Sequence, residues 1–341
     1  MALNDISDIK KCLVLAATTW GEYIRLKDEL AKQGLKEFDN FFYWEAYIKK
    51  IAVVHANCYG SAYMEFLKKS QDFAGEYFLY PLPAIHMNMA GRLDEALLKN
   101  CDLFIHQDIR KDNRYGYYFS DEYILPRLNK DCKRLVVPNL VPFTEVIFPK
   151  SFVTGAPRIN LHGATQDVLF AGNRILDEAF QSGKDLEGIM AEFLDVNIVS
   201  EKEKQQVRDH FDEKMESLRK REEKWDVKIR DYILENYQEY KLFTDLSHPS
   251  LKLMSEICRR IGKTLGLRDV LEIQLDSDYE MVEMYVMPWV KDALGLKFSE
   301  KYVRSNNRLN LPNRNKLGDG RMGLREYIRE YVYWKFGKFL D

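Results

Sequence analysis

The sequence predicts an α/β fold in which a small three-layer unit with a parallel sheet is embedded in a predominantly helical chain. Between residues 49 and 150, short and nearly continuous apolar runs alternate with stretches of helical periodicity. This alternation is typical of a parallel sheet that helices cover on both faces. After Pro149 the apolar runs almost vanish and helical patterns take over.

The elements of the α/β unit follow from these runs, because each apolar run has the length of a strand and each periodic stretch that of a short helix. Four strands are expected, at 51–55, 76–80, 102–106 and 134–138. Helices are expected between them, at 60–69, 91–99 and 120–131.

Helices are also predicted on both sides of this unit. Apolar side chains at three- and four-residue spacing predict an amphipathic helix over residues 8–33, which Gly34 ends. Residues 151–165 are expected to form a loop, and further helices are expected at 166–181, 185–194, 200–239, 249–265, 278–294 and 322–336. The predicted parts are a helical extension (1–48), the α/β core (49–150), a helical region (151–300) and a basic segment (301–341).

Composition restricts the class of protein. The chain has 341 residues, of which 46% are hydrophobic and 30% charged, as in a globular protein with a sizeable core. It contains no apolar run of about 18 residues, the length that predicts a membrane-spanning helix, and its first residues do not resemble a secretory signal. An odd number of cysteines without a C-x-x-C pair favours reduced thiols and a cytoplasmic protein. The cysteines are Cys12, Cys58, Cys101, Cys132 and Cys258.

Charge is unevenly distributed along the chain. The formal net charge of −2 argues against nucleic-acid binding. The last 41 residues, however, hold ten Lys or Arg against four acidic residues, enough to attract an anionic ligand locally. Candidate phosphate contacts are Arg304, Arg308, Arg314, Lys316 and Arg321 in this segment and Arg110, Lys111 and Arg114 after the third strand, with solvated surface charge as the alternative for each.

Cys58 is the candidate nucleophile. It follows the first predicted strand directly, at the carboxyl edge where open α/β sheets bind their ligands. The helix expected from Gly60 would lower the pKa of a thiol at its amino terminus. Backbone N–H groups of the same turn, at Asn57, could stabilise an oxyanion. The alternative is that Cys58 is a small buried apolar side chain.

Asp245 and His248 form the candidate base. Their spacing allows the carboxylate to orient the imidazole, which is the arrangement that activates a nucleophile in acyl transfer. Pro249 would then begin the next helix. The alternative is that Asp245 or Ser247 only caps that helix.

Several other polar residues lie in the predicted strands or at their ends. Gln107 ends the third strand, so its amide could donate to an oxyanion beside Cys58, although polar residues commonly close strands. His55 and His106 lie inside strands and are expected to be packed and hydrogen-bonded. Neither the histidines nor any acidic cluster predicts a metal site. No G-x-G-x-x-G or P-loop motif occurs, so dinucleotide-dependent redox chemistry and P-loop phosphoryl transfer have no support.

The polar segments resemble those of a known superfamily. The strand leading to Ala56-Asn57-Cys58, the strand ended by Gln107, and the Asp245–His248 segment are similar to the first, third and last blocks of the SGNH (GDSL-type) hydrolases and acyltransferases. That resemblance implies a flavodoxin-like sheet, a nucleophile at Cys58, oxyanion donors at Asn57 and Gln107, and an Asp/His pair. The superfamily has serine where Cys58 stands, and its glycine block has no clear match near Pro81-Leu82-Pro83.

More closely, the chain resembles the WcbI-type polysaccharide biosynthesis family over roughly residues 49–300. The similar stretches are 53–60, 101–107, 136–149 and 218–250. The family's turn usually reads Gly-Asn-Cys-Gln, whereas this chain has Ala56 and Tyr59 around Asn57-Cys58. The resemblance implies acetyl transfer from acetyl-coenzyme A to a sugar or polysaccharide, as in capsule biosynthesis. The phosphates of this co-substrate would then meet Arg110, Lys111 and Arg114 in the loop after the third strand and Arg304 and Arg308 in the basic segment.

Three hypotheses therefore remain at the level of sequence. The first is acyl transfer from acyl-coenzyme A to a sugar hydroxyl. Cys58 is either a covalent nucleophile in this transfer or has no covalent role, in which case His248 activates the sugar for direct attack. The second is an esterase or deacetylase in which water is the acceptor. The third is a non-catalytic module that binds a glycan or nucleotide.

Overall fold

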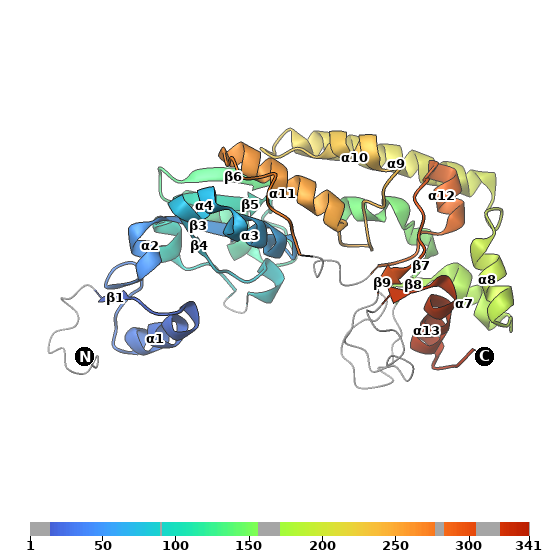
Figure 1. The fold of residues 1–341 in the computed structure, drawn as a ribbon, viewed down its shortest axis with the longest axis horizontal. Helices are drawn as coiled ribbons and strands as arrows, with labels where there is room; N and C mark the ends of the chain where they lie inside the picture. The colour runs from blue at the N-terminus through green and yellow to red at the C-terminus, as the bar shows by residue number, and fades with distance from the viewer. Residues whose placement is uncertain (1–13, 89–90, 156–170, 277–282, 305–320, 341) are drawn as a thin grey trace. The chain divides into compact units, whose positions relative to one another are not determined.

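The computed structural model describes residues 14–88, 91–155, 171–276, 283–304 and 321–340 (Figure 1). The chain divides into two compact units. The first, called the α/β unit below, comprises Met1–Pro138, Trp225–Val227 and Cys258–Gln274. The second, called the helical unit, comprises Asn139–Lys224, Lys228–Ile257 and Leu275–Asp341.

A four-stranded parallel sheet forms the centre of the α/β unit (Figure 1). The spatial order of its strands is β4-β3-β5-β6, so the chain first adds a strand on one side of β3 and then crosses to the other side. The carboxyl ends of β3 and β5 therefore mark a topological switch point, where open α/β sheets bind ligands. All four predicted strands are confirmed: β3 (Lys50–His55), β4 (Tyr77–Tyr80), β5 (Leu103–Gln107) and β6 (Lys133–Val137).

Helices cover both faces of this sheet. Ile51 and Val53 on one face belong to a buried cluster that includes Tyr23 of α1. On the other face, α3 comes so close to β3 that a Cβ at Gly60 would lie 3.5 Å from Val54 Cγ1. The three predicted layers are therefore confirmed. The helices of this unit are α1 (Trp20–Lys32), α2 (Trp44–Ile48), α3 (Tyr59–Lys69), α4 (Gln71–Glu76), α5 (Glu95–Lys99) and α6 (Asp121–Ile124), with short 3₁₀ turns at Ile85–Met87 (η3), Tyr117–Phe119 (η4) and Leu125–Arg127 (η5).

The predicted helix over 8–33 is wrong in its first part. Residues 14–16 form strand β1 (Val14–Ala16), which pairs in parallel with β2 (Phe41–Tyr43). The helix begins only at Trp20, because Thr19 adopts an extended backbone and forms a capping box with Glu22. Helical periodicity did not reveal the boundary, since a three-residue strand is too short to show its own period.

The helical unit is built mainly of helices, as predicted after Pro149. The stretch expected as one helix over 200–239 is two helices, because the Glu222 carboxylate accepts the N–H groups of Ile229 and Arg230 at the break. The elements are η6 (Val141–Ile147), η7 (Lys150–Phe152), α7 (Arg174–Gln181), α8 (Leu186–Leu194), α9 (Glu201–Glu222), α10 (Arg230–Asn236), α12 (Pro288–Leu294), α13 (Leu324–Phe336) and two short antiparallel pairs, β7 (Val153–Thr154) with β8 (Gly172–Asn173) and β9 (Val303–Arg304) with β10 (Arg321–Met322).

Helix α11 (Leu251–Leu265) belongs to both units. Its first half is part of the helical unit, and from Cys258 onward it is part of the α/β unit. There the Cys258 thiol lies 3.8 Å from the carbonyl oxygen of Ala62 on α3. Among the helices in the described parts of the chain, none has the length and apolar character needed to cross a membrane.

The four cysteines in the described ranges are free thiols: Cys58, Cys101, Cys132 and Cys258. The sulfur atoms of Cys101 and Cys132, which precede neighbouring strands, are 3.8 Å apart, well beyond a bonded distance of about 2 Å. Cys12 lies outside the described residues.

Candidate functional site

Cys58 lies at the topological switch point of the sheet. It follows β3 after two residues and occupies the N-cap position of α3 with φ −53° and ψ −24°. Its side chain is half-buried, in contrast to the buried Cys101 and Cys258. The backbone at Ala56 needs no left-handed conformation, since Phe38 is the one non-glycine residue with positive φ in the described segments. An alanine is therefore compatible with this turn.

A ring of hydrogen bonds holds the turn from the neighbouring strand. The Asn57 N–H donates to Gln107 Oε1 at 3.0 Å, and Gln107 Nε2 donates to Asn57 Oδ1 at 3.2 Å and to the Pro138 carbonyl at 3.0 Å. Gln107 thus ties together the carboxyl ends of β3, β5 and β6. Its side chain is buried, with 1% of the residue exposed.

This geometry changes the role expected for Gln107. A primary amide has two N–H hydrogens, and both are engaged, one by Asn57 and one by Pro138. Direct donation to an oxyanion would break one of these bonds in a buried place, where an unmade hydrogen bond is costly. Gln107 is therefore a positioning residue for the turn, and so is Asn57, whose N–H is also engaged.

The backbone N–H of Cys58 is the better candidate for an oxyanion donor. The next three N–H groups are all used locally, by Asn57 Oδ1, the Asn57 carbonyl and the Cys58 carbonyl. For the N–H of Cys58, no partner occurs within the part of the chain that the structure describes. A donor at the amino terminus of an 11-residue helix is suited to developing negative charge.

Tyr63 is a neighbour of this turn that the sequence did not single out. Its hydroxyl donates to the Pro138 carbonyl at 3.2 Å, the same oxygen that Gln107 contacts. Burial, with a smaller effect of the Cys258 and Cys58 thiols, raises its pKa well above the usual value. Tyr63 is therefore a neutral phenol that supports the end of β6. Its position on the buried side of α3, five residues after Cys58, is the signal in the sequence that could have identified it.

In the helical unit, Asp245 orients His248 as the sequence suggested. The carboxylate oxygens lie 2.9 and 3.1 Å from His248 Nδ1. Oxygen Oδ1 also accepts the backbone N–H groups of Ser247 (2.6 Å) and His248 (3.0 Å). An ionised carboxylate can only accept, so Nδ1 carries the proton of the neutral ring and Nε2 bears the basic lone pair. Asp245 is 1% exposed, and the His248 side chain is 22% exposed.

The alternative interpretation, that Asp245 or Ser247 caps the next helix, is wrong. Helix α11 begins at Leu251, and the hydroxyl of Ser250 accepts the N–H of Leu253. Pro249 accordingly precedes the helix instead of starting it, as had been expected. The Asp245 carboxylate is thus left to the turn and the imidazole.

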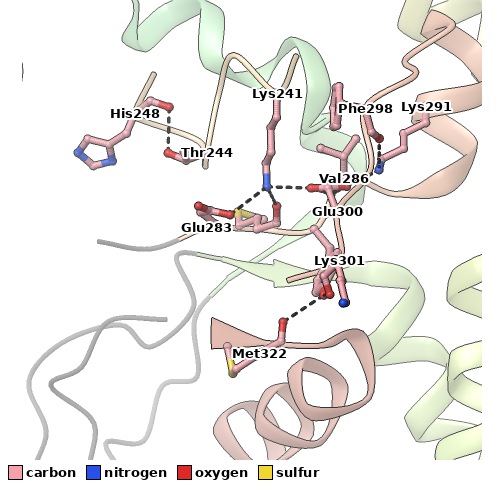
Figure 2. Close-up of polar contacts among 12 residues, drawn as sticks. Lys241, Thr244, His248, Glu283, Val286, Lys291, Phe298, Glu300, Lys301 and Met322 are labelled. Carbon is pink, nitrogen blue, oxygen red and sulfur yellow. Dashed lines mark hydrogen bonds and ion pairs between the residues drawn. The ribbon is translucent and has the colours of Figure 1, made fainter. Parts of the chain in front are cut away.

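A framework of backbone contacts fixes this turn (Figure 2). Thr244 donates its N–H to the His248 carbonyl at 3.0 Å, and its own carbonyl accepts the N–H of Met284 at 2.8 Å. The hydroxyl of Thr144 on η6 donates to the Leu246 carbonyl at 2.5 Å. In Figure 2 the imidazole of His248 points away from Thr244 and Lys241.

Below the turn lies a buried ion network that the sequence did not reveal (Figure 2). Lys241 Nζ lies 2.8 Å from Glu300 Oε1 and donates to the Met284 carbonyl at 2.7 Å. The same carboxylate pairs with Lys291 at 2.6 Å, and its side chain is 5% exposed. The network holds residues 284–286 in place, and through Met284 it supports Thr244 and the His248 turn.

The basic candidates lie in different parts of the fold. Arg110, Lys111 and Arg114 are exposed in the loop after β5, at the same edge of the sheet as Gln107. Arg114 contacts the hydroxyl of Tyr115 at 2.8 Å. Arg304 is in β9 of the helical unit, where its carbonyl accepts the N–H of Glu283. Arg308, Arg314 and Lys316 lie outside the described residues.

His55 and His106 are packed and hydrogen-bonded, as expected. His55 Nε2 lies 3.0 Å from the Phe119 carbonyl, and its ring stacks on Phe104 and Phe119. His106 Nδ1 lies 3.1 Å from Asp121 Oδ1. In the described ranges, no group of three or more His, Cys, Asp or Glu side chains could hold a metal ion.

We expect His55 to make the free energy of unfolding depend on pH. Burial, opposed by the bond to Phe119, lowers its pKa to about 4, whereas an unfolded histidine has a pKa of about 6.5. Between these values the unfolded state binds one more proton, so stability falls as pH falls, by up to about 1.4 kcal/mol per unit. The free energy of unfolding, measured with urea at pH values from 7 to 4, should therefore fall less steeply with decreasing pH in His55→Gln than in the wild type. The control His86→Gln, which changes an exposed histidine, should show the wild-type decline. Equal slopes in all three proteins would contradict this assignment.

Comparison with known proteins decides the family. The model of the family described as "Polysaccharide biosynthesis enzyme WcbI" matches residues 51–270, which include every residue of the Cys58 turn and of the Asp245–His248 turn. The chain belongs to the WcbI family. The similarity to this family that the sequence indicated is thereby confirmed.

A solved structure agrees with this family. It is described as WcbI, a novel polysaccharide biosynthesis enzyme, in a native form without a disulfide bond between coenzyme A and a cysteine of that protein. The two chains share 19% identity, with 84% of this chain and 89% of that one covered, at a TM-score of 0.60. This likeness shows the α/β fold of the WcbI family in the present chain. No curated protein matches the sequence.

Proposed function

We propose that this WcbI-family enzyme transfers a short acyl group, acetyl in the simplest form, from acyl-coenzyme A to a hydroxyl of a sugar. The reaction would belong to the cytoplasmic biosynthesis of a bacterial surface or capsular polysaccharide. The observation that carries the proposal is the buried Asp245 carboxylate 2.9 Å from His248 Nδ1, because it fixes the orientation of the imidazole ring, as a general base requires. A half-buried thiol at the switch point of a sheet supplies the second group.

The proposed chemistry has two steps. The Cys58 thiolate attacks the thioester carbonyl, the carbon–sulfur bond to coenzyme A breaks, and the coenzyme A thiolate leaves and takes up a proton. The sugar hydroxyl then attacks the acyl-cysteine while His248 Nε2 accepts its proton, and the Cys58 thiolate is released. The Cys58 N–H is the proposed donor to the oxyanion in both steps. In the direct variant, His248 activates the sugar for attack on acyl-coenzyme A itself.

Basic side chains are proposed to bind the phosphates of the co-substrate. Arg110, Lys111 and Arg114 are exposed at the sheet edge that carries Cys58, so a pyrophosphate there would meet several cations in one loop. Arg304 and Arg308 are proposed as further contacts from the basic segment. That the WcbI structure is described with reference to coenzyme A and a cysteine of that protein is consistent with this co-substrate.

Coenzyme A is expected to raise the melting temperature of the protein. A ligand that binds only the folded state at about a hundred times its Kd adds about 2.7 kcal/mol of stability. Differential scanning fluorimetry with coenzyme A and acetyl-coenzyme A measures the shift. Replacing Arg110, Lys111 and Arg114 together by Gln should reduce it strongly. The same charge change at Arg25, Lys32 and Lys36, which are exposed on and after α1, is the matched control and should leave it intact.

The remaining hypotheses predict different outcomes in the same experiments. An esterase would release acid from a chromogenic acetyl ester without any need for coenzyme A. A binding module would turn over neither ester nor thioester. Absence of any shift with coenzyme A at millimolar concentration would contradict the acyltransferase proposal.

A further inference from the structure

The helical unit contains a cavity of about 310 Å³ that no step above uses. It lies where η7 and the first turns of α9 meet α12. Its apolar wall consists of the buried side chains of Val146, Phe152, Val207 and Trp289. Its polar groups include Ser151, Gln206 and His210. Its volume is at the lower end of the range for small-molecule sites, roughly 300–1,000 Å³.

We propose that this cavity binds a neutral pyranose unit of the acceptor glycan. The proposal rests on the function proposed above, since it names the class of the acceptor. Gln206 and His210 lie one helical turn apart on α9, on the same face as Val207. This face offers hydroxyl-binding groups beside an apolar surface, and a sugar ring likewise combines hydroxyl groups with apolar C–H faces.

The charges at the cavity are already neutralised within the protein. Lys150 pairs with Glu145 at 2.7 Å, and that carboxylate also pairs with Lys214. Glu203 lies 3.7 Å from the guanidinium of Arg174 and also accepts the N–H and hydroxyl of Ser200 in a capping box. Among the residues that line the cavity, Lys150 and Glu203 carry opposite charges, so the lining has no surplus of charge of either sign, which favours a neutral ligand over a uronic acid or a sugar phosphate.

A buried donor at the cavity lacks a partner. Trp289 lines the cavity and is 0% exposed, and its indole Nε1 has no hydrogen-bond partner in the described parts of the chain. A buried donor without a partner costs about 1–3 kcal/mol. A ligand hydroxyl or ring oxygen would recover that cost if the side chains of the cavity wall shifted to expose the indole hydrogen, since the nitrogen is buried in this structure.

The cavity and the His248 turn share one element. Thr144 on η6 holds the Leu246 carbonyl of the turn, while Val146, two residues later, lines the cavity. Both features belong to the helical unit. A sugar bound in the cavity would thus be held by the same segment that positions the proposed base. The hydroxyl that is acylated would belong to the bound sugar residue or to the next sugar residue of the glycan.

Binding of methyl hexopyranosides tests the proposal. The probes are the methyl glycosides of glucose, galactose and mannose, with methyl glucuronide as the charged comparison, measured by saturation-transfer NMR and calorimetry. At least one neutral probe should bind. Gln206→Leu should weaken this binding on the order of tenfold, as expected for one lost hydrogen bond, and Val207→Phe should abolish it by filling the cavity. Gln205→Leu is the matched control, because Gln205 on the same helix bonds Asp209 instead of lining the cavity, and it should bind as the wild type does.

Each outcome decides the question. Three results would overturn the subsite: none of the neutral probes binds, binding persists in Val207→Phe, or the glucuronide binds more tightly than the neutral probes. Melting curves show whether Val207→Phe is folded, and Gln206→Leu at the helix surface provides a second readout if it is not. The shift with coenzyme A is measured on the same proteins. If coenzyme A still raises the melting temperature while no sugar binds, the subsite alone is wrong. If coenzyme A does not raise the melting temperature either, the proposed function fails.

Discussion

Replacing His248 by alanine is expected to reduce the rate of acyl transfer by roughly 10²–10⁴-fold, the usual contribution of a positioned general base. The structure gives the reason, since Asp245 fixes the ring through Nδ1, and the proposed mechanism assigns the proton of the incoming hydroxyl to Nε2. Both the covalent and the direct route need this proton transfer, so both should be lost. The rate is measured as release of the coenzyme A thiol in the presence of the acceptor.

The neighbouring carboxylate provides a second, more specific variant. Asp245→Asn has nearly the same shape, but its amide nitrogen can donate to Nδ1 and so favour the tautomer in which Nε2 carries the proton. We expect a loss in rate close to that of His248→Ala, with an unchanged melting shift on coenzyme A. His86→Ala, which changes an exposed histidine of the α/β unit, should keep the wild-type rate. Transfer at the wild-type rate by His248→Ala would remove His248 from the mechanism.

Replacing Cys58 by alanine is expected to abolish transfer on the covalent route. The thiolate forms the acyl-enzyme, and the amides of Asn57 and Gln107 beside it cannot take its place, because a carboxamide is not a nucleophile. Mixing the His248→Ala variant with acetyl-coenzyme A should then accumulate an enzyme heavier by one acetyl group, since the acyl-cysteine is formed but its transfer is slow. Intact-mass spectrometry detects this species, and peptide mapping should place the acetyl group on Cys58.

A second half-buried thiol serves as the control for this experiment. Cys132 is in the same unit, before β6, and Cys132→Ser should neither lower the rate nor prevent acylation. Substantial transfer by Cys58→Ala, without any acyl-enzyme in the His248→Ala variant, would instead support direct attack of the sugar on acyl-coenzyme A. In that outcome His248 remains the base, and the Cys58 N–H remains available as a donor.

Much of the α/β unit could be predicted because its strands are local features. Each is a run of apolar residues long enough to show a burial pattern, and all four appear within two residues of the predicted bounds. The turn at Cys58 and the spacing of Asp245 and His248 were likewise visible. Short or context-dependent elements were missed, such as β1 inside the predicted helix and the break between α9 and α10.

By itself, the sequence determined which residues are candidates for the proposed chemistry: a thiol after a buried strand and a carboxylate three residues before an imidazole. The tertiary structure alone decided the order of the strands, and with it the position of Cys58 at a switch point. It also decided that Gln107 binds Asn57, a residue 50 positions away, and that Ser250 caps α11, so that Asp245 is left for His248. The physical reason is that burial and backbone conformation follow local pattern, whereas the partner of a hydrogen bond depends on which distant segments the fold brings together.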